Sequence, residues 1–370
     1  MNYPIFQQDT QPNTYQAQLD DKAKRIEALF APFQPPKLEL YPSAPSHFRL
    51  RAEFRLWHSG ERCFYAMFAG EDRKTVLEVQ DFPIASPLIN RLMHALLHQL
   101  HHSDLLRRKL FQVEFLTTLS GDALVTLIYH KRLDASWQEA AQALEQQLGF
   151  PVIGRSLKQK VVLERDFVRE SLKVDGKTFH YKQIEGGFTQ PNGEVNQKML
   201  AFARSCAKEV NPKGQHDLVE LYCGNGNFSV ALADCFRQVL ATEISKTSVQ
   251  AAQDNIRDNG ISNLIIARLS SEEFVLALRQ EREFERLKGV DLSQYDFQTL
   301  LVDPPRAGLD EQSVKQAQAY QNIIYISCNP DTLAANLATL CQTHRIARFA
   351  LFDQFPYTHH CEVGVLLCKR

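Results

Sequence analysis

The spacing of hydrophobic and polar residues changes near residue 180 and divides the chain into two parts. Before this point, strands of alternating polarity separated by turn signals predict an antiparallel sheet accompanied by helices. From about Gln190 onward, strand-length apolar runs alternate with helical patterns, which is typical of a parallel sheet covered by helices on both faces. The sequence therefore predicts an α+β domain over residues 1–180 and an α/β domain over residues 181–370.

The clearest pattern in the first part is a strict alternation from His47 to Trp57. Arg49, Arg51 and Arg55 fall on one face of the predicted strand, and apolar side chains fall on the other. This pattern predicts a half-buried strand with a cationic outer face. The other elements expected here are strands at 63–68, 110–119, 123–131, 161–165 and 172–181, and helices at 20–30, 87–102 and 136–148.

The second part contains predicted strands that are each followed by a predicted helix. The strands are expected at 217–222, 238–243, 264–268, 299–303 and 323–327, and the helices at 228–235, 246–259, 271–278, 310–319 and 330–341. Ligands of such sheets bind at the carboxyl ends of the strands. The chemistry should therefore lie directly after the strands.

Length and composition support two globular domains. At 370 residues the chain is long for one core, and its 44% hydrophobic and 23% charged residues are near globular averages. The N-terminus is polar and shows no secretory signal, and no apolar run approaches the ~20 residues that cross a bilayer. We therefore expect a cytoplasmic protein without a membrane partner.

Cysteine usage and charge narrow the choice further. The eight cysteines are scattered and none forms a CxxC pair, which predicts reduced thiols and argues against a structural zinc ion or an iron–sulfur cluster. The net charge is −1, with 23 Lys and Arg against 21 Asp and Glu in residues 1–180 and 19 against 22 in residues 181–370. Any binding of nucleic acid would therefore require a local basic face.

The first strand of the second part runs into Glu220-Leu-Tyr-Cys-Gly224-Asn-Gly226-Asn-Phe-Ser229. The two glycines permit a tight turn that brings the backbone close to a ligand. A dinucleotide fingerprint would place glycine or alanine where Ser229 stands, so the fit to a pyrophosphate is poor. Glu220 would repel a phosphate, but it suits the cationic amino-acid end of S-adenosylmethionine.

Glu243 closes the second of these strands, 19 residues after Gly224. An acidic side chain at this place can accept hydrogen bonds from both ribose hydroxyls. The alternative is a capping residue for the helix that begins at Lys246. Taken with the glycine loop, Glu243 favours an adenosyl ligand.

Asp303-Pro-Pro-Arg306 follows the fourth strand. Two prolines cannot extend a strand ladder or a helix, so they stiffen the turn that holds Asp303 at the edge of the sheet. A simple strand-ending turn is the alternative. It leaves the carboxylate after an apolar run unexplained.

Cys328 follows the fifth strand and therefore lies at the same edge as Asp303 and Gly224. The other seven cysteines are best interpreted as packing residues. Cys328 differs because it stands at the end of a central strand, before a helix N-terminus that can favour a thiolate.

A thiol in this position matches one particular reaction. Carbon 5 of uracil is too weak a nucleophile to take a methyl group from a sulfonium, but thiolate addition at carbon 6 moves electron density to carbon 5. A general base must afterwards remove the carbon-5 proton. Glu362 is a candidate, His359 or His360 could serve instead, and Glu362 could also be an ordinary exposed strand residue.

Five motifs in this order resemble those of the uracil-5 RNA methyltransferases, and the resemblance covers essentially the whole chain. The motifs are Phe188-Thr-Gln-Pro-Asn192, Glu220–Ser229, Asp303-Pro-Pro-Arg306, Ser327-Cys-Asn-Pro330 and His359-His-Cys-Glu362. The resemblance implies a Rossmann-like S-adenosylmethionine methyltransferase domain over 181–370. It also implies that the α+β domain over 1–180 recognises RNA.

The resemblance further implies roles for individual residues. Cys328 is implied as the nucleophile and Glu362 as the proton acceptor, and Arg306 would lie beside the substrate. The residues implied to contact S-adenosylmethionine are Gln190, Tyr222, Asn227, Glu243 and Asp303. Tyr222 stands where the commoner methyltransferase loop has its first glycine, a substitution that is usual in this family.

The substrate implied by the resemblance is tRNA, in which the tRNA-type members make ribothymidine (5-methyluridine) in the T loop; they are also credited with transfer-messenger RNA. The T loop stacks its target base, so the enzyme must extrude the uridine. Phe111 is a candidate to fill the gap, with core packing as the alternative. Arg49, Arg51 and Arg55 are candidates for RNA contacts, and we expect a monomer.

Other classes of function fit the sequence less well. Relatives that methylate uracil in ribosomal RNA carry a cysteine-ligated iron–sulfur cluster, and its motif is not visible here. A purine amino-group methyltransferase of RNA would need no thiol, and RNA cytosine-5 enzymes carry a second cysteine where Asp303–Arg306 has none. A non-catalytic RNA-binding module would have no use for Cys328, Asp303 and Glu362 together.

Overall fold

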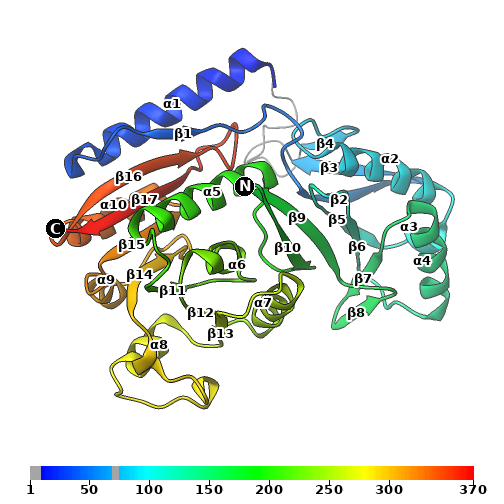
Figure 1. Cartoon of the computed structure of the whole chain (residues 1–370). Helices are drawn as coiled ribbons and strands as arrows, with labels where there is room; N and C mark the ends of the chain where they lie inside the picture. Colours follow the sequence, from blue (N-terminus) through cyan, green and yellow to red (C-terminus); the bar gives the residue numbers. More distant parts are fainter. Residues whose placement is uncertain (1–9, 69–74) are drawn as a thin grey trace. The chain divides into compact units, whose positions relative to one another are not determined.

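The structure of the protein is a computed structural model that describes residues 10–68 and 75–370. The chain forms two compact units (Figure 1). The first contains the described residues of 10–15, 44–171 and 183–193, and the second contains residues 16–43, 172–182 and 194–370. The division is therefore not a single cut near residue 180, because the segment 16–43 supplies a helix and an edge strand to the second unit.

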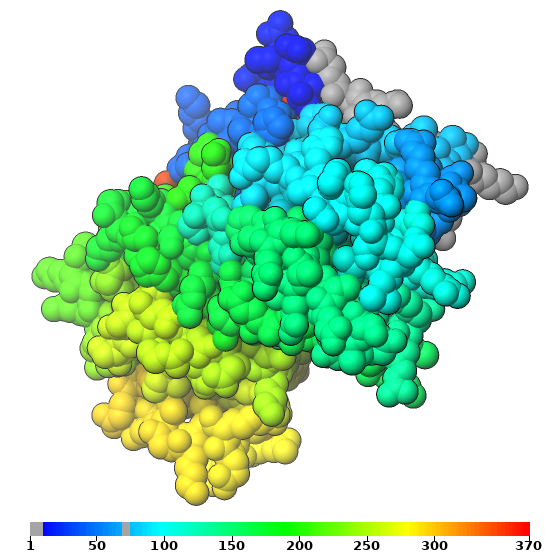
Figure 2. All heavy atoms as spheres, turned by 90° about the vertical axis from the view of Figure 1, so that its right-hand side faces the viewer, coloured from blue at the N-terminus to red at the C-terminus, as the bar shows by residue number. Residues whose placement is uncertain are grey.

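The first unit is built on a seven-stranded sheet of order β4-β3-β2-β5-β6-β7-β8. Its neighbouring strands are antiparallel, as predicted, except for the parallel pair β6 and β7. The strands are β2 (Arg51–Ser59), β3 (Arg62–Phe68), β4 (Val76–Val79), β5 (Leu110–Thr117), β6 (Ala123–Tyr129), β7 (Val152–Ser156) and β8 (Gln159–Val162). The helices are α2 (Pro87–His101), α3 (Asp104–Arg107) and α4 (Ala135–Leu148). Figure 2 shows atoms of this unit in light blue to blue-green.

The alternation of the first predicted strand is confirmed from Arg51 onward in β2, whereas residues 47–50 of the prediction lie outside the strand. Ala52, Phe54 and Leu56 are buried, whereas Arg51 and Arg55 are half-buried on the other face. Phe54 packs in the core against aromatic rings of neighbouring strands, which explains why the apolar face of this strand is continuous. The cationic face predicted for β2 is therefore present in the first unit.

The second unit is built on an eight-stranded sheet of order β1-β16-β17-β15-β14-β11-β12-β13. The strands are β1 (Glu39–Tyr41), β11 (Asp217–Leu221), β12 (Val239–Thr242), β13 (Leu264–Ala267), β14 (Phe297–Val302), β15 (Asn322–Ser327), β16 (His344–Phe352) and β17 (Glu362–Lys369). The helices are α1 (Pro12–Phe30), α5 (Gly193–Val210), α6 (Asn227–Leu232), α7 (Lys246–Asp258), α8 (Ser271–Leu278), α9 (Glu311–Ala317) and α10 (Pro330–Leu340). Five neighbouring strands from β13 to β15 are parallel, and β17 is antiparallel to both of its neighbours.

Helices cover both faces of this sheet, as predicted for the second part. Leu218 of β11 packs in the same cluster as Met199 of α5. The next residue, Val219, points to the opposite face and belongs to a cluster that contains Ile26 of α1 and Leu337 of α10. Because successive strand residues point to opposite faces, the apolar runs of the sequence fill both layers.

Several elements differ from the sequence-based prediction. Helix α1 begins at Pro12 instead of residue 20, and α5 and β16 were not predicted. The predicted strands at 161–165 and 172–181 are wrong in their bounds: β8 ends at Val162, and β9 (Phe167–Val174) and β10 (Lys177–Ile184) form a hairpin. The hairpin turns at Asp175 and Gly176, whose φ values of 52° and 74° are those of a tight hairpin turn. Each helix of the described residues is too short or too polar to cross a membrane.

Candidate active site

The carboxyl ends of four neighbouring strands carry most of the predicted site residues (Figure 1). β11 contains Glu220, β12 ends before Glu243, β14 ends before Asp303, and β15 ends before Cys328. These parallel strands are adjacent in the order β15-β14-β11-β12, so their ends lie side by side. The structure therefore brings these residues together at one edge of the sheet in the second unit.

Glu362 reaches the same edge by a different route. It is the first residue of β17, which is antiparallel to β15, and the register pairs Ser327 with Val363. The start of β17 therefore lies beside the end of β15, where Cys328 follows. Because β17 runs antiparallel beside β15, the motif that ends in Glu362 lies next to Cys328.

The glycine loop is tied to Glu243. The backbone N–H of Gly224 donates to Oε2 of Glu243 at 3.0 Å, and the N–H of Ser245 donates to Oε1 at 2.7 Å. The helix cap of α7 is Ser245, whose hydroxyl accepts from the Ser248 N–H, so the alternative role of Glu243 as the cap is wrong. The carboxylate is half-buried beside the loop, as a ribose-binding residue should be.

Tyr222 adopts a backbone conformation that favours glycine. Its φ is 64°, in the left-handed region, which costs a residue with a side chain of the order of 1 kcal/mol. The phenol oxygen donates to Oγ of Ser271 at 2.9 Å, at the first turn of α8. This bond directs the ring toward α8 and fixes its orientation.

Asn227 is fixed by a reciprocal pair of amide hydrogen bonds. Its Nδ2 donates to Oδ1 of Asn196 at 3.0 Å, and Nδ2 of Asn196 donates back to Oδ1 of Asn227 at 3.0 Å. Asn196 lies on α5 and is buried. The sequence reasoning missed Asn196; a polar residue on the buried face of an unpredicted helix gave no recognisable signal.

Glu220 is a buried carboxyl with an unused oxygen. Its Oε2 accepts the hydroxyl of Ser229, and its Oε1 has no hydrogen-bond partner among the described residues. Burial raises the pKa of Glu220 to about 8. A buried acid with a free oxygen suits the cationic amino group of S-adenosylmethionine, so Glu220 fits this cofactor.

The thiol of Cys328 is held in its protonated form. It is half-buried, and burial first, then the carboxylates of Glu362 and Asp303, raise its pKa to about 11. The charge of Arg306 lowers the pKa, but burial and the two acids outweigh it, so the expected influence of the following helix N-terminus does not decide the state of the thiol.

Glu362 is buried, with 4% of its surface exposed, so it is not an ordinary exposed strand residue. Its Oε2 has no hydrogen-bond partner among the described residues, and burial together with Asp303 raises its pKa well above the usual range. Burial raises the pKa of Asp303 to about 7. Of the two alternative bases, His359 is exposed, and His360 has a pKa lowered by burial and neighbouring cations. Glu362 raises the pKa of the Cys328 thiol, so its carboxyl lies close to the sulfur.

Arg306 connects the proline turn to the cysteine loop. Its carbonyl oxygen accepts from Nδ2 of Asn329 at 2.9 Å and from Oγ1 of Thr332 at 3.3 Å. Asn329 also caps α10. The guanidinium is exposed and near enough to lower the pKa of Cys328, so it is free to meet a substrate at the mouth of the site.

The remaining predicted residues belong to the first unit: Gln190, Arg49, Arg51, Arg55 and Phe111. The guanidinium of Arg55 lies 3.6 Å from the centroid of the Phe111 ring, and the ring of His130 stacks at 4.1 Å. Two groups so close to one centroid must cover opposite faces of the ring. Arg51 donates to the carbonyl of Gly187 at 3.0 Å, and Nε of Arg49 donates to the Arg51 carbonyl at 2.8 Å. Their roles toward cofactor or RNA stay predictions.

Ile244 is a further residue that sequence reasoning missed. It follows Glu243 directly and leaves 70% of its surface exposed. An exposed apolar side chain beside the carboxylate of Glu243 offers a flat surface on which a ring could pack. The signal in the sequence was an isoleucine between two polar residues at a strand end.

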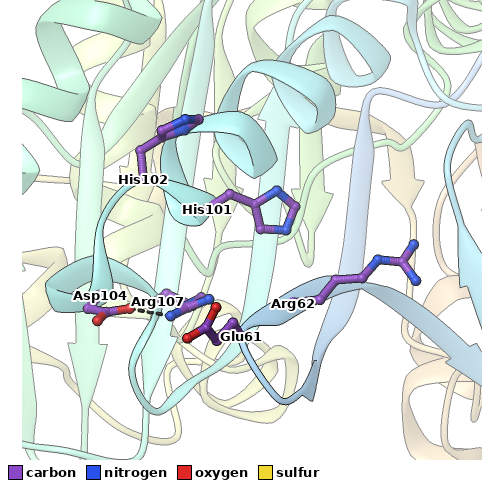
Figure 3. A pocket seen from close by; sticks show the side chains of 6 residues that line it. All are labelled: Glu61, Arg62, His101, His102, Asp104 and Arg107. Atoms are coloured by element: carbon purple, nitrogen blue, oxygen red, sulfur yellow. Dashed lines mark hydrogen bonds and ion pairs between the residues drawn. The ribbon is translucent and has the colours of Figure 1, made fainter.

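The first unit contains a pocket of about 680 Å³ (Figure 3). Its lining residues are Glu61, Arg62, His101, His102, Asp104 and Arg107. Figure 3 shows Asp104 and Arg107 pointing toward one another, and Arg62 is paired with Glu78. Both of its arginines already have acidic partners, so we assign no ligand to this pocket. Residues 10–68 and 75–370 contain no cluster of three or more His, Cys, Asp or Glu suited to a metal ion.

Comparison with known proteins gives a consistent result. The family model of tRNA (uracil-5-)-methyltransferase matches residues 14–370. A tRNA/tmRNA (uracil-C(5))-methyltransferase of Chromohalobacter salexigens is 56% identical over 364 residues, 97% of each chain, and one of Actinobacillus pleuropneumoniae is 54% identical over the full length of both. The solved structure of a tRNA (uracil-54, C5)-methyltransferase of Pyrococcus abyssi, in complex with S-adenosyl-L-homocysteine, matches with a TM-score of 0.69 at 20% identity. The match covers 95% of this chain and 83% of the Pyrococcus chain, and it confirms the predicted mixed α/β, Rossmann-like methyltransferase fold. This chain belongs to the tRNA (uracil-5-)-methyltransferase family.

Proposed function

We propose that this protein transfers a methyl group from S-adenosylmethionine to carbon 5 of a uridine in tRNA, through a temporary bond between Cys328 and carbon 6. One observation supports this proposal above the others. A thiol, a buried base and an unpartnered buried acid, namely Cys328, Glu362 and Glu220, lie at one edge of the sheet. A methyl transfer to oxygen or nitrogen would leave the thiol without a purpose.

The cofactor would be held by residues around the glycine loop. Glu220 has the free oxygen for the amino group, and Glu243 would bind the ribose hydroxyls. Tyr222 and Asn227 have fixed orientations at the loop, and Asp303 stands beside it. Gln190, in the first unit, is included on the basis of its motif. When bound, S-adenosylmethionine supplies an electrophilic methyl group.

Cys328 would open the reaction. The thiol gives up its proton to water, the resulting thiolate adds to carbon 6 of uracil, the π bond between carbons 5 and 6 breaks, and its electron pair makes carbon 5 the nucleophile that takes the methyl group. Arg306, exposed beside the thiol, is placed to balance the negative charge that develops on the ring.

Glu362 would close the reaction. Once carbon 5 carries the methyl group, Glu362 removes the carbon-5 proton, the double bond re-forms, and the bond between sulfur and carbon 6 breaks with its electron pair on sulfur. Glu362 must be ionised for this step, and the raised pKa of its carboxyl makes the carboxylate a stronger base than that of an ordinary glutamate. A buried base is also protected from exchange with water.

The RNA would be tRNA, with the T-loop uridine as the target and transfer-messenger RNA as a second substrate. Relatives at 54–56% identity are named for both RNAs. Arg51 and Arg55 of β2, and Arg49 just before it, would contact the RNA backbone, and Phe111 would stack on a base after one of its present neighbours moves away. We propose that the protein acts as a monomer in the cytoplasm.

The decisive experiment combines unmodified tRNA transcript with labelled S-adenosylmethionine and maps the product nucleoside. We expect 5-methyluridine in the T loop. With 5-fluorouridine RNA a stable protein–RNA adduct should form through Cys328, because fluorine cannot leave as a proton does, and Cys328→Ala should form none. Label on a purine amino group, or turnover by Cys328→Ala near the wild-type rate, would contradict the mechanism.

A further inference from the structure

The segment 353–361 joins β16 to β17 and ends directly before Glu362. Helix α1, which runs alongside β1 and β16 in Figure 1, contacts this segment through three polar residues. Gln18, Lys22 and Arg25 are spaced by four and three positions, so they share one side of the helix. All of these residues belong to the second unit.

The contacts fall on every second residue of the segment. Nζ of Lys22 donates to Oδ1 of Asp353 at 2.7 Å and to the carbonyl of Phe355 at 2.8 Å. The further contacts are Gln18 Nε2 to Asp353 Oδ2 at 2.9 Å, Tyr357 N–H to Gln18 Oε1 at 3.2 Å, Arg25 to the His359 carbonyl at 2.6 Å and Arg25 to Cys361 Sγ at 2.9 Å. The helix therefore fixes the segment at five alternate positions.

Lys22 is unusual because it stands in the middle of the apolar face of α1. Leu19, Ile26 and Phe30 are buried at positions that continue the same stripe, and Lys22 and Asp353 have 6% and 0% of their surfaces exposed. A buried ion pair adds little net stability compared with apolar packing, so stability alone does not account for a lysine at this position. Its geometry, a pair of bonds to the first residues of the segment, points to a positional role.

The segment also contains a strained backbone conformation that neighbouring residues must stabilise. Tyr357 has a φ of 62°, in the left-handed region, and its N–H is bound by Gln18. A non-glycine residue keeps such a conformation when its surroundings over-determine it. At the other end, Glu362 has an oxygen without a hydrogen-bond partner among the described residues, so its orientation depends on the packing of the residues before it.

We propose that Lys22, with Gln18 and Arg25, is a positioning residue: α1 anchors the segment 353–361 and thereby aims the carboxylate of Glu362 at the substrate. The inference rests on the proposed role of Glu362 as the base. Loosening the anchor would impair the last proton transfer, whereas thiol addition and methyl transfer depend on Cys328 and the cofactor loop. The methylated covalent adduct between Cys328 and RNA would then accumulate.

The test compares adduct and turnover in the full-length protein. Lys22→Met leaves Asp353 buried without its partner and could impair folding, so the main variant is Lys22→Met with Asp353→Asn, which removes both charges and still releases Phe355. Lys24→Met, which removes a positive charge from an exposed position of α1, is the matched control. Circular dichroism and thermal melting show whether each variant is folded. Covalent complexes with ordinary uridine tRNA are counted on denaturing gels during turnover.

We expect the double variant to have kcat lowered at least ~10-fold, KM for tRNA within ~2-fold, and adduct per turnover raised at least ~10-fold. A purely structural role would lower adduct and turnover together, and that result, or wild-type values in the folded double variant, would overturn the inference. Wild-type protein with 5-fluorouridine tRNA is run in parallel. Absence of its adduct would count against the proposed function itself, whereas presence of that adduct with an unaffected double variant counts against the anchor alone.

Discussion

The protonated state of Cys328 leads to a prediction about its reactivity. A rise of the pKa from the ordinary value of 9 to about 11 makes the thiolate roughly 100-fold rarer at a given pH below 9. Iodoacetamide reacts with the thiolate, so Cys328 should be alkylated about 100-fold more slowly at pH 8 than a thiol of ordinary pKa and equal access. The alkylation rate should rise about tenfold per pH unit up to pH 10 without reaching a plateau.

Removing one acid should shift this profile in a defined direction. Glu362→Gln removes an acid whose charge raises the pKa of Cys328, so the thiolate becomes easier to form. Burial is the largest cause of the rise and Asp303 contributes too, so the pKa should fall only part of the way to its ordinary value. Alkylation of the variant at pH 8 should therefore be ~3-fold to ~10-fold faster than in the wild type.

The assay is site-resolved, because the protein has eight cysteines. Digestion followed by mass spectrometry follows the peptide that contains Cys328, with Cys328→Ala as the blank. Glu311→Gln removes the same charge from an exposed position of α9 and should leave the rate unchanged. A plateau near pH 9 in the wild type, or a slower rate in Glu362→Gln, would refute the electrostatic argument.

Three more predictions follow from single residues of the site. The pKa of Glu220 is about 8 in the folded protein, above the ordinary 4.5. Its stabilising contribution is therefore present below pH 4.5 and is lost as the pH rises through 8. In urea unfolding, Glu220→Gln should raise the free energy of unfolding by about 1–3 kcal/mol at pH 8.5 and have little effect at pH 4.5. Equal effects at both pH values would count against this. Asn196→Leu should weaken binding of S-adenosylhomocysteine ~5-fold to ~10-fold in calorimetry, because Asn227 loses both amide bonds. Ile244→Ala should weaken the same binding ~3-fold through lost apolar contact, and unchanged affinity would exclude Ile244 from the adenine site.

Much of the site could be predicted from the sequence because it depends on local order. Gly224, Glu243, Asp303 and Cys328 each follow a strand of a parallel sheet, and such strands end at a common edge whatever their order. The same reasoning could not place Glu362, since it starts an antiparallel strand whose neighbours are set by the whole sheet. Its role required the family motif.

Other features were beyond local reasoning because they depend on partners far away in the sequence. Asn196 meets Asn227 across 31 residues, and Lys22 meets Asp353 across 331. The state of the thiol also escaped prediction, since burial and two acids from other segments reverse the effect of the adjacent helix. Local pattern indicates what a residue can do, and long-range packing decides in which state it does so.

The pairing of β1 with β16 affects how the protein can fold during synthesis on the ribosome. Glu39 is opposite Ala350, so the first strand made must wait for one of the last. At a synthesis rate of ~5–20 residues per second, this wait is roughly 15–60 seconds. During that time β1 has no strand to pair with, and neither Glu362 nor the rest of β17 has been translated. A chain that stops before β17 therefore contains Cys328 but lacks both Glu362 and the strand that joins β15 to β16.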